Sequence, residues 1–256
     1  MAAGDRTQPD WRDAAAYAPL LHADRSLLAW EWLRRNPAYR AAATVALSSG
    51  GRTGPGADPA SWGLHAFEPP DAAVPAARPV WSSALHRFVL DVEARPSDDG
   101  DAFDFRRLGP LSTILRAAAG GEHLLLSDGF RTIRLDVLVG TLAHGPVALR
   151  VRLGGPGSAE RIVLPLRRLL SLWKTGRFVR SLHPEEVRAR RWVQMLRAWD
   201  ARAAGASQRE IAAVLLSAEA GQPRWRSRSP SVRSQAQRLL RGAQHMALGG
   251  HRALLQ

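Results

Sequence analysis

The C-terminal end of the chain combines many arginines with no carboxylate. Glu219 is the last acidic residue, and the seven arginines after it are Arg224, Arg226, Arg228, Arg233, Arg238, Arg241 and Arg252. Guanidinium groups hold phosphate oxygens and the edge of guanine through paired hydrogen bonds. A surface without carboxylates does not repel a nucleic-acid backbone. This pattern therefore predicts binding to double-stranded DNA.

Positive charge is concentrated in the last third of the chain. The whole chain has a formal net charge of +13, and from Gly176 onward fifteen arginines face five acidic residues, a balance of +10. The first 175 residues therefore contribute the remaining +3. A basic region attached to a nearly neutral body indicates a polyanionic partner that one end of the molecule contacts. The alternative explanation is a solvated basic face that touches no nucleic acid.

Patterns typical of catalysis, metal binding and membrane insertion are missing from the sequence. The chain has no cysteine, which excludes disulfides, thiolate nucleophiles and Cys-ligated zinc. Its eight histidines form neither an HxxxH nor an HExxH pair, and no Gly-x-Ser-x-Gly elbow occurs. No stretch approaches the ~20 apolar residues of a membrane span, and the N-terminus lacks an apolar signal core.

We therefore expect no enzyme, no cofactor, no metal site and no membrane contact, with a cytoplasmic, nucleoid-associated location. An active site of carboxylates or histidines that meet only in the folded chain stays open as an alternative, since such sites leave little trace in sequence.

Residues 10–47 have the pattern of a helical region and define an expected first domain at 1–47. Asp24 is a good helix cap in front of an apolar series. Asn36-Pro37 stops this helix, because the residue before proline is disfavoured in the α conformation. The following residues 48–79 are rich in glycine and proline and are predicted to form a linker.

The middle of the chain, residues 80–176, changes to short apolar or alternating runs that predict strands. These runs are 85–94, 123–127, 130–139 and 147–153. Asp128-Gly129 between two of them is a strong hairpin signal. The expected elements are a small antiparallel sheet at about 80–165, one short helix at 111–119, and an amphipathic helix from Pro165 to Lys174 that ends at Gly176.

The last region, residues 177–256, is predicted to form three helices around one core. The first opens at Pro184 and ends at Gly205. Its inner stripe is expected at Trp192, Met195, Leu196, Trp199 and Ala203. The second begins with a capping box of Ser207 and Glu210. Its inward residues are expected to be Ile211, Val214 and Leu215.

The third helix begins at Ser229-Pro230 and has a regular apolar face. The residues of this face are Val232, Ala236, Leu239, Leu240, Ala243 and Met246. Such helices describe a helix-turn-helix domain, but residues 217–228 before the third helix far exceed the usual turn of about 3–4 residues. We therefore expect a variant with an extended basic loop, which Trp225 holds to the core. The expected fold class is α+β: an N-terminal helical segment, a small central antiparallel sheet and a C-terminal three-helix helix-turn-helix variant.

The predicted DNA-binding residues lie on the third helix, on the loop before it and at the start of the second helix. A major groove about 12 Å wide accepts one helix, whose N-terminal polar side chains reach base edges. The expected base-reading residues are Ser231, Arg233, Ser234, Gln235 and Arg238. Phosphate contacts are expected from Gln208, Arg209, Arg224, Arg226, Arg228 and Arg241. In an alternative arrangement, the last helix is a dimerisation element and the loop binds the DNA.

Both ends of the chain also resemble proteobacterial families. At the C-terminal end, the residues that carry the resemblance are Leu196-Arg197-Ala198, Asp200, Gly205-Ala206-Ser207, Arg209-Glu210-Ile211-Ala212, Trp225-Arg226, Arg238-Leu239-Leu240-Arg241, Gly249-Gly250, Arg252 and Leu254-Leu255. They are similar to a variant helix-turn-helix family, long catalogued as a domain of unknown function, in regulators of integrative and conjugative element transfer. The sequence departs from this family at Gln208, where histidine is common, and at His251, where an aromatic residue is common.

At the N-terminal end, Asp10-Trp11-Arg12, Tyr17, Asp24-Arg25 and residues 29–37 resemble a family called transcriptional-regulator-like. The two ends together resemble activators of the FseA type, which act on excision and transfer of conjugative elements. The resemblance implies a transcriptional activator, with RNA polymerase or a homologous antiactivator domain as protein partner. The alternative function is a protein–protein regulator that has only non-specific affinity for DNA. Either function is compatible with an oligomer.

Overall fold

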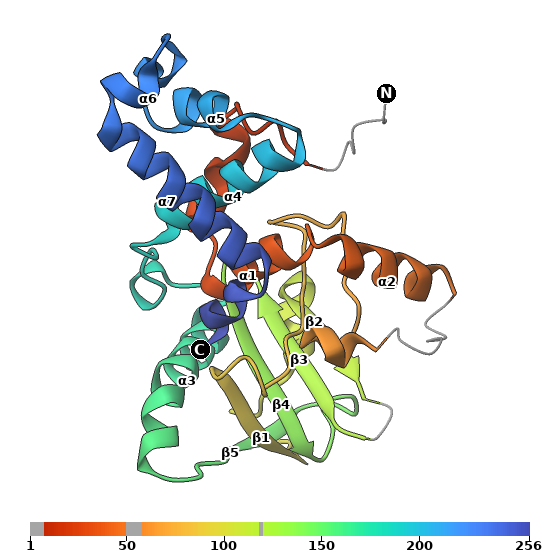
Figure 1. Ribbon diagram of the computed structural model, residues 1–256. Coiled ribbons are helices and arrows are strands. Elements are labelled where there is room, and N and C mark those ends of the chain that lie inside the picture. The colour runs from red at the N-terminus through yellow and green to blue at the C-terminus, as the bar shows by residue number, and fades with distance from the viewer. Residues whose placement is uncertain (1–7, 50–57, 118–119) are drawn as a thin grey trace.

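The computed structural model describes residues 8–49, 58–117 and 120–256, apart from the side chains of Ser158, Arg226 and Arg228. Helices from both ends of the chain gather on one side of the molecule, and a five-stranded sheet with one long helix forms the other side (Figure 1). The predicted α+β class, with N-terminal helices, a central sheet and C-terminal helices, is confirmed.

The N-terminal helical segment consists of the 3₁₀ helix η1 (Ala15–His22) and the helices α1 (Arg25–Leu33) and α2 (Pro37–Ser48). Asp24 caps α1 as predicted, because its carboxylate accepts a hydrogen bond from Leu27 N at 3.0 Å. The chain turns at Asn36, as the following proline predicts, and the Asn36 side chain then caps α2.

The described part of the predicted linker packs against these helices. Residues 50–57 lie outside the described residues, and the segment after them contains the 3₁₀ helix η2 (Pro59–Trp62). Trp30 Nε1 donates a hydrogen bond to the carbonyl of Ala72 at 2.8 Å, and the Tyr39 hydroxyl donates to that of Glu68 at 2.7 Å. These contacts fix residues 58–79 to α1 and α2.

The central sheet has the strand order β2-β3-β4-β1-β5. Its strands are β1 (Val89–Pro96), β2 (Ser112–Arg116), β3 (Glu122–Ser127), β4 (Thr132–Val139) and β5 (Val147–Val151). The predicted hairpin at Asp128-Gly129 joins β3 and β4. Gly129 has a φ of +96°, and the Asp128 carboxylate accepts hydrogen bonds from the amides of Phe130 and Arg131. Local turn chemistry therefore specifies this hairpin.

Two details of the central prediction were wrong. The sheet is mixed rather than antiparallel, because the chain crosses over after β1, builds β2 and β3 at the far edge, and returns so that β4 runs parallel to β1. The predicted helix at 111–119 is the strand β2, which pairs with β3, while residues 118–119 lie outside the described residues. Alanines after Arg116 favour a helix, but the ladder to β3 satisfies the backbone of the β-branched Thr113 and Ile114.

Helix α3 (Pro156–Thr175) covers one face of the sheet and begins nine residues before the predicted start. Pro156 lies in the first turn of the helix, where a backbone N–H has no partner within the helix and its absence in proline costs nothing. The helix therefore starts there rather than at Pro165. The helix ends at Gly176, as predicted, with a φ of +68°. The sheet and α3 enclose a core that includes Leu90, Leu124, Leu126, Leu135, Val137, Leu169 and Leu172.

The C-terminal region contains α4 (Ala189–Ala203), α5 (Gln208–Leu215), α6 (Trp225–Arg228) and α7 (Pro230–Ala247), with 3₁₀ helices η4 (Arg180–Leu182), η5 (Ala218–Gly221) and η6 (Gly250–Leu255). Helix α4 starts at Ala189 rather than Pro184, because the Glu186 carboxylate binds Arg188 N and Arg25 Nε and holds the chain in a turn. Its inner side also differs from the prediction. Val193, Met195, Leu196 and Ala198 are buried, Trp192 and Trp199 are half-buried, and Ala203 is exposed.

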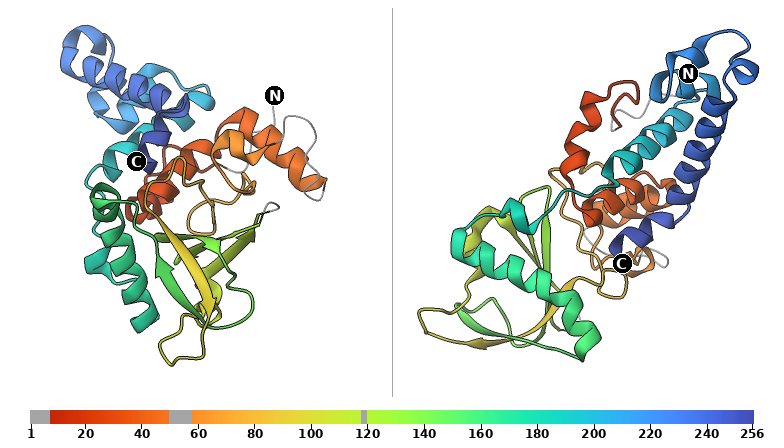
Figure 2. Two further views of the ribbon diagram at one scale, coloured as in Figure 1. Left: turned by 90° about the horizontal axis from the view of Figure 1, so that it is seen from below. Right: turned by 90° about the vertical axis from the view of Figure 1, so that its left-hand side faces the viewer.

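One hydrophobic core runs through the helices of both chain ends. It includes Tyr17, Leu27 and Trp30 from the N-terminal part and Leu196, Leu240 and Leu255 from the C-terminal part. Both views in Figure 2 show α1 beside the C-terminal helices. We call this body the helical head, and the body of β1–β5 and α3 the sheet unit. The boundaries 1–47, 48–79, 80–176 and 177–256 stay a prediction.

Candidate nucleic-acid interface

Helix α7 presents three polar stripes to solvent. Its apolar face is as predicted, with Ala236, Leu239, Leu240, Ala243 and Met246 buried and Val232 partly buried. Successive residues turn by about 100° around a helix, so residues three, four or seven apart share a stripe. The exposed stripes are Arg233–Gln237–Arg241–Gln244, Ser234–Arg238–His245 and Ser231–Gln235.

These stripes divide the predicted base-reading set. Ser234 and Arg238 lie opposite the buried face and form the outermost ridge of α7. Arg233 and Gln235 are two residues apart, so they are turned by about 200° from each other and lie on opposite flanks of this ridge. A helix that enters a groove with its ridge first directs one flank toward each wall. The five predicted base-reading residues therefore face three directions: the ridge and the two flanks.

A hollow of about 400 Å³ lies beside the Arg233 flank. It is lined by Arg202 at the end of α4, Gln208 at the start of α5, and Gln237, Leu240, Arg241 and Gln244 on α7. The structure thus brings together Gln208 and Arg241 from the predicted set. Sequence reasoning missed Arg202, Gln237 and Gln244 as site residues. The spacing of Gln237 and Gln244 around Arg241 is the signal that could have identified two of them.

The capping box fixes the start of α5. Ser207 Oγ accepts a hydrogen bond from Glu210 N at 3.3 Å, and the Glu210 carboxylate accepts one from Ser207 N at 2.8 Å, as predicted. Arg209 Nη2 donates a hydrogen bond to the carbonyl of Gly221, which links α5 to the following loop, and its phosphate contact stays a prediction. Val214 is 44% exposed, so the prediction that it points inward was wrong. Ile211, Ala212 and Leu215 form the buried side of α5, and Val214 lies at the edge of it.

The long segment between α5 and α7 is compact. Trp225 is 4% exposed and packs in a small core with Ala212, Ala220 and Ala236, which confirms that it holds this segment in place. Ser229 Oγ donates a hydrogen bond to the Glu219 carboxylate at 3.0 Å. Arg224 is exposed and has a left-handed φ of +57°. The side chains of Arg226 and Arg228 lie outside the described residues.

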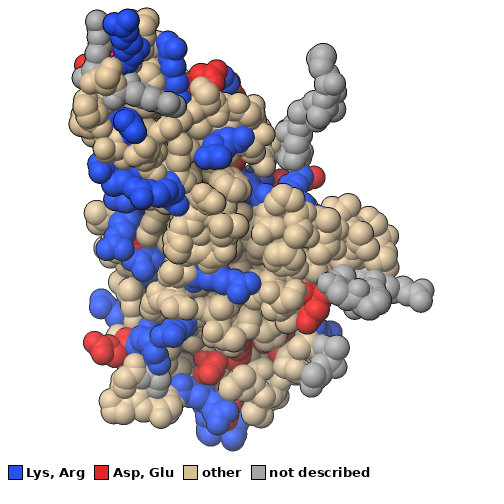
Figure 3. All heavy atoms as spheres, in the orientation of Figure 1, with Lys and Arg blue, Asp and Glu red and all other residues tan. Residues whose placement is uncertain are grey.

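Basic side chains gather on one side of the molecule. Figure 3 shows Lys and Arg along α6 and α7 and, below them, along α3, with few acidic atoms between. Among the described residues, the guanidinium groups of Arg233, Arg238 and Arg241 have no ion-pair partner. They are therefore available to an external anion.

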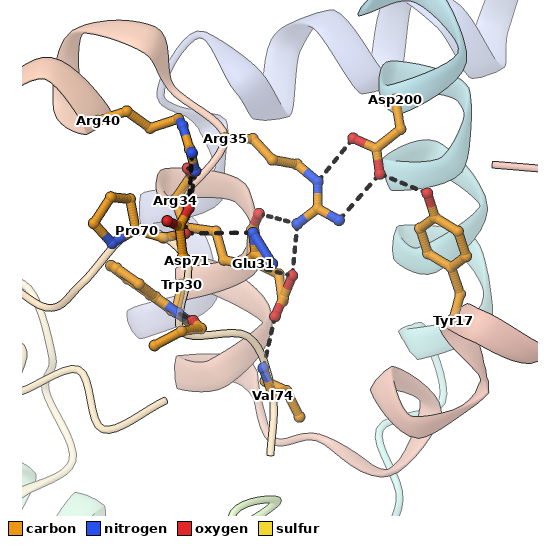
Figure 4. Close-up of polar contacts among 11 residues, drawn as sticks. Tyr17, Trp30, Glu31, Arg34, Arg35, Arg40, Pro70, Asp71, Val74 and Asp200 are labelled. Carbon is orange, nitrogen blue, oxygen red and sulfur yellow. Dashed lines mark hydrogen bonds and ion pairs between the residues drawn. The ribbon is translucent and has the colours of Figure 1, made fainter. Parts of the chain in front are cut away.

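A buried ion-pair network fixes the interface to the N-terminal helices (Figure 4). The Asp200 carboxylate on α4 accepts hydrogen bonds from Arg35 Nε at 2.7 Å, from Arg35 Nη2 at 3.0 Å and from the Tyr17 hydroxyl at 2.6 Å. Arg35 Nη1 also binds the Glu31 carboxylate at 2.5 Å, and Arg34 Nε lies 3.2 Å from that carboxylate. Two carboxylates and two guanidinium groups thus neutralise each other. We call these five residues the Asp200 network.

The shifted pKa values agree with ionised pairs in this network. Burial raises the pKa of Glu31, but Arg35 and Arg34 outweigh burial and hold it below its usual 4.5. Burial lowers the pKa of Arg35, whereas Asp200 and Glu31 raise it more, so it stays charged. Burial and the charge of Asp200 raise the pKa of Tyr17, which keeps its hydroxyl a donor. Helix α4 is therefore held by charge-assisted hydrogen bonds.

One cluster of metal-ligating types occurs among the described residues, formed by His65, His123 and Asp136. The two imidazole rings are stacked, with centroids 3.5 Å apart and planes at 20°. Lone pairs in two nearly parallel rings do not converge on one ion. His123 Nδ1 and Arg134 Nη2 both already bind Asp136 Oδ1, at 2.7 and 2.8 Å. In this arrangement the cluster joins the segment after η2 to the sheet unit.

Two family models match parts of the chain. Residues 158–256 match the RovC DNA-binding domain, described as "T6SS, Transcription factor, DNA binding domain". Residues 10–65 match the proteobacterial transcriptional regulator-like domain. No curated protein matches the chain. In the described part of the chain, no helix has the length and apolar character needed to cross a bilayer. The matches support a DNA-binding transcriptional regulator of a proteobacterial type, and the first of them contains the whole α4–α7 surface.

Proposed function

We propose that the chain is a transcriptional activator that places α7 in the major groove of duplex DNA as part of a variant helix-turn-helix. The observation that carries this proposal is the exposed ridge of α7, which carries Arg238 and has the unpaired Arg233 and Arg241 on one flank, in a stretch without acidic residues after Glu219. An α-helix with its side chains is about 10–12 Å wide, which matches a major groove about 12 Å wide.

In the proposed complex, the ridge of α7 reads bases and its flanks hold the walls of the groove. Arg238 meets a guanine through two hydrogen bonds, and Ser234 contacts the neighbouring base. Arg233 reads a base beside one wall of the groove. Gln235 reads a base beside the other wall, and Ser231 lies on the same flank as Gln235. The separation of Arg233 from Gln235 around the helix supports contacts to opposite strands.

Phosphate contacts are proposed on both sides of this helix. Arg241, Arg202 and Gln208 surround the hollow beside α7 and suit one strand of the backbone. Arg224, Arg226 and Arg228 precede α7 and suit phosphates near its N-terminal end. Arg209 adjoins Gln208 at the start of α5, and although its Nη2 is bound to Gly221, its other N–H groups suit a phosphate.

The genes under control are proposed to be those for excision and transfer of a mobile element. This proposal rests on the resemblance of the two chain ends to FseA-type activators, whereas the matching DNA-binding family is described by the term T6SS. Chromatin immunoprecipitation in the source organism distinguishes the two. Binding upstream of excision genes supports our proposal, and binding confined to secretion genes contradicts it.

The test of DNA recognition is selection of binding sites from a random duplex library with the full chain. The isolated region 177–256 is unsuitable, because its core is completed by the N-terminal helices and Asp200 is paired with Arg35. We expect an enriched motif that the protein binds better than scrambled DNA at about physiological salt. Arg190→Ala, which removes an exposed arginine at the other end of α4, serves as the control and should keep this preference.

Equal affinity for all duplexes, lost as salt rises, would contradict sequence-specific binding. It would favour the alternative of a protein–protein regulator that has only non-specific affinity for DNA. That alternative predicts a tight complex with a homologous antiactivator domain or RNA polymerase, which a pull-down with the purified partner measures.

A further inference from the structure

A second cavity lies in the sheet unit, apart from the α4–α7 surface. It has a volume of about 240 Å³ and lies between the segment before β1, the strand β1 itself, the end of β5 and the first half of α3. A water molecule takes about 30 Å³ of liquid, so the cavity has room for a small metabolite. It is too small for a nucleic-acid or protein segment, and its charged lining distinguishes it from a packing defect.

Arginines dominate the charge of this cavity. Arg87, Arg152 and Arg161 line it from three different segments, with Asp91 as the acidic residue among its lining residues. Arg152 Nε lies 3.9 Å from Glu93, which is a weak pair. The guanidinium groups of Arg87 and Arg161 have no hydrogen-bond or ion-pair partner among the described residues. The three cations around this cavity outnumber the nearby acids Asp91 and Glu93, which favours an anion inside it.

A buried histidine forms part of the cavity wall. His86 lines the cavity and is 8% exposed, while its Nδ1 is buried beneath the wall without a hydrogen-bond partner among the described residues. Burial and the nearby Arg134 lower the pKa of His86 to about 3, so this ring is neutral and the positive charge of the cavity comes from the arginines.

The cavity lies at the joint between the sheet unit and the helical head. Arg87 N donates a hydrogen bond to the carbonyl of Leu255 at 3.0 Å. Leu255 is buried in the core of the helical head, where η6 packs against α1. A molecule bound by Arg87 therefore touches the segment that joins the two parts.

We propose that this cavity binds a small organic phosphate, with the phosphate group held by Arg87, Arg152 and Arg161 and a hydroxyl of the ligand facing Asp91. The ligand thus belongs to the class of phosphorylated metabolites, and it occupies a site separate from the proposed DNA surface.

The test is isothermal titration calorimetry of the full chain with glycerol 3-phosphate, at constant ionic strength, with inorganic phosphate and citrate as further probes. We expect Arg161→Gln to weaken binding of glycerol 3-phosphate about tenfold, since one charge-assisted contact is lost. Ser83→Glu, which adds a carboxylate at an exposed lining residue, should abolish it. Both side chains are exposed, and thermal melting confirms that the variants fold.

Arg177→Gln is the matched control, because Arg177 is an exposed arginine just beyond the other end of α3. It should change the affinity by less than about twofold, since surface substitutions away from a site have small effects. Equal weakening by Arg161→Gln and Arg177→Gln would overturn the proposal, because net charge alone would then explain binding. Absence of binding by glycerol 3-phosphate would also overturn the proposal. Binding of citrate alone would overturn it too, because the ligand class would then be carboxylates rather than phosphates. DNA binding is measured separately, so failure of one proposal leaves the other intact.

Discussion

Arginine has opposite environments in two regions of the molecule. In the Asp200 network, Arg34 and Arg35 have side chains that are 1% exposed and paired with carboxylates. On α7, Arg233, Arg238 and Arg241 are exposed and have no ion-pair partner among the described residues. A buried guanidinium needs an opposite charge because it has lost its water, whereas an exposed one can exchange water for phosphate. The environment of each arginine, rather than the number of arginines in a segment, therefore distinguishes structural arginines from binding arginines.

The largest expected effect is a loss of stability when an ion pair of the Asp200 network is removed. Asp200→Asn keeps the shape of the side chain but leaves Arg35 with less opposite charge, and Tyr17 with a weaker acceptor. We expect the free energy of unfolding to fall by about 3–5 kcal/mol, the usual cost of removing one partner of a buried pair. Urea denaturation followed by tryptophan fluorescence measures this change.

Asp98→Asn is the control for this substitution, because Asp98 is an exposed acid in a turn of the sheet unit. It should change the free energy of unfolding by less than about 0.5 kcal/mol. A similar small loss for Asp200→Asn would mean that packing alone holds α4 against α1, and that the ion pairs contribute little.

A second effect comes from histidines outside the Asp200 network. Burial lowers the pKa of His86 to about 3, and burial with neighbouring positive groups lowers those of His65 and His183 to about 4. The folded chain therefore binds fewer protons than the unfolded chain below the ordinary value of 6.5. The stability that these neutral histidines contribute is complete above pH 6.5 and is lost as the pH falls toward the folded pKa values.

For His86 alone we expect a loss of about 2–3 kcal/mol between pH 7 and 4.5, since about two pKa units lie in this range and each corresponds to about 1.4 kcal/mol. Glu31 does not contribute to this loss, because its stabilisation is present above its ordinary value of 4.5 and falls only below it. Urea denaturation at a series of pH values measures the slope. His86→Gln should flatten it, whereas His144→Gln, at an exposed position, should not. A flat profile in the unmodified chain would show that the histidines are solvated.

Sequence analysis succeeded where the cause of a structure is local. The cap at Asp24, the hairpin at Asp128-Gly129 and the capping box of α5 each depend on a few neighbouring residues, and all are present. The apolar face of α7 follows from spacing alone. The strand β2 was missed because its partner β3 outweighs the helix preference of the alanines nearby.

The candidate site shows the same limit. Clustering of arginines identified α7, but its division into a ridge and two flanks required the orientation of the helix on its core. Asp200 is separated from Arg35 by 165 residues and from Tyr17 by 183 residues. Spacing within a segment carries no information about pairs so far apart. The network that positions the interface was therefore invisible in the sequence.

On the exposed side, Arg238→Ala should affect recognition without affecting the fold. We expect a loss of about 1–3 kcal/mol in binding to the selected motif and a relaxed preference at one base pair. The free energy of unfolding should stay within about 0.5 kcal/mol of the original. Fluorescence anisotropy with the motif and with single-base variants measures the preference. An equal loss on every sequence would reassign Arg238 from a base to a phosphate.

The smallest expected effect is that of Arg241→Ala, on the flank beside Gln208. If Arg241 neutralises one phosphate, its removal lowers the slope of log affinity against log salt by about 0.9. The affinity should fall by a similar factor for the motif and for scrambled DNA, because a phosphate contact carries no base information. Anisotropy at several salt concentrations gives both slopes, with Arg190→Ala as the control. An unchanged slope would place the hollow away from the DNA, and α7 would then contact the DNA through the ridge, where Arg238 lies, and through the flank of Ser231 and Gln235.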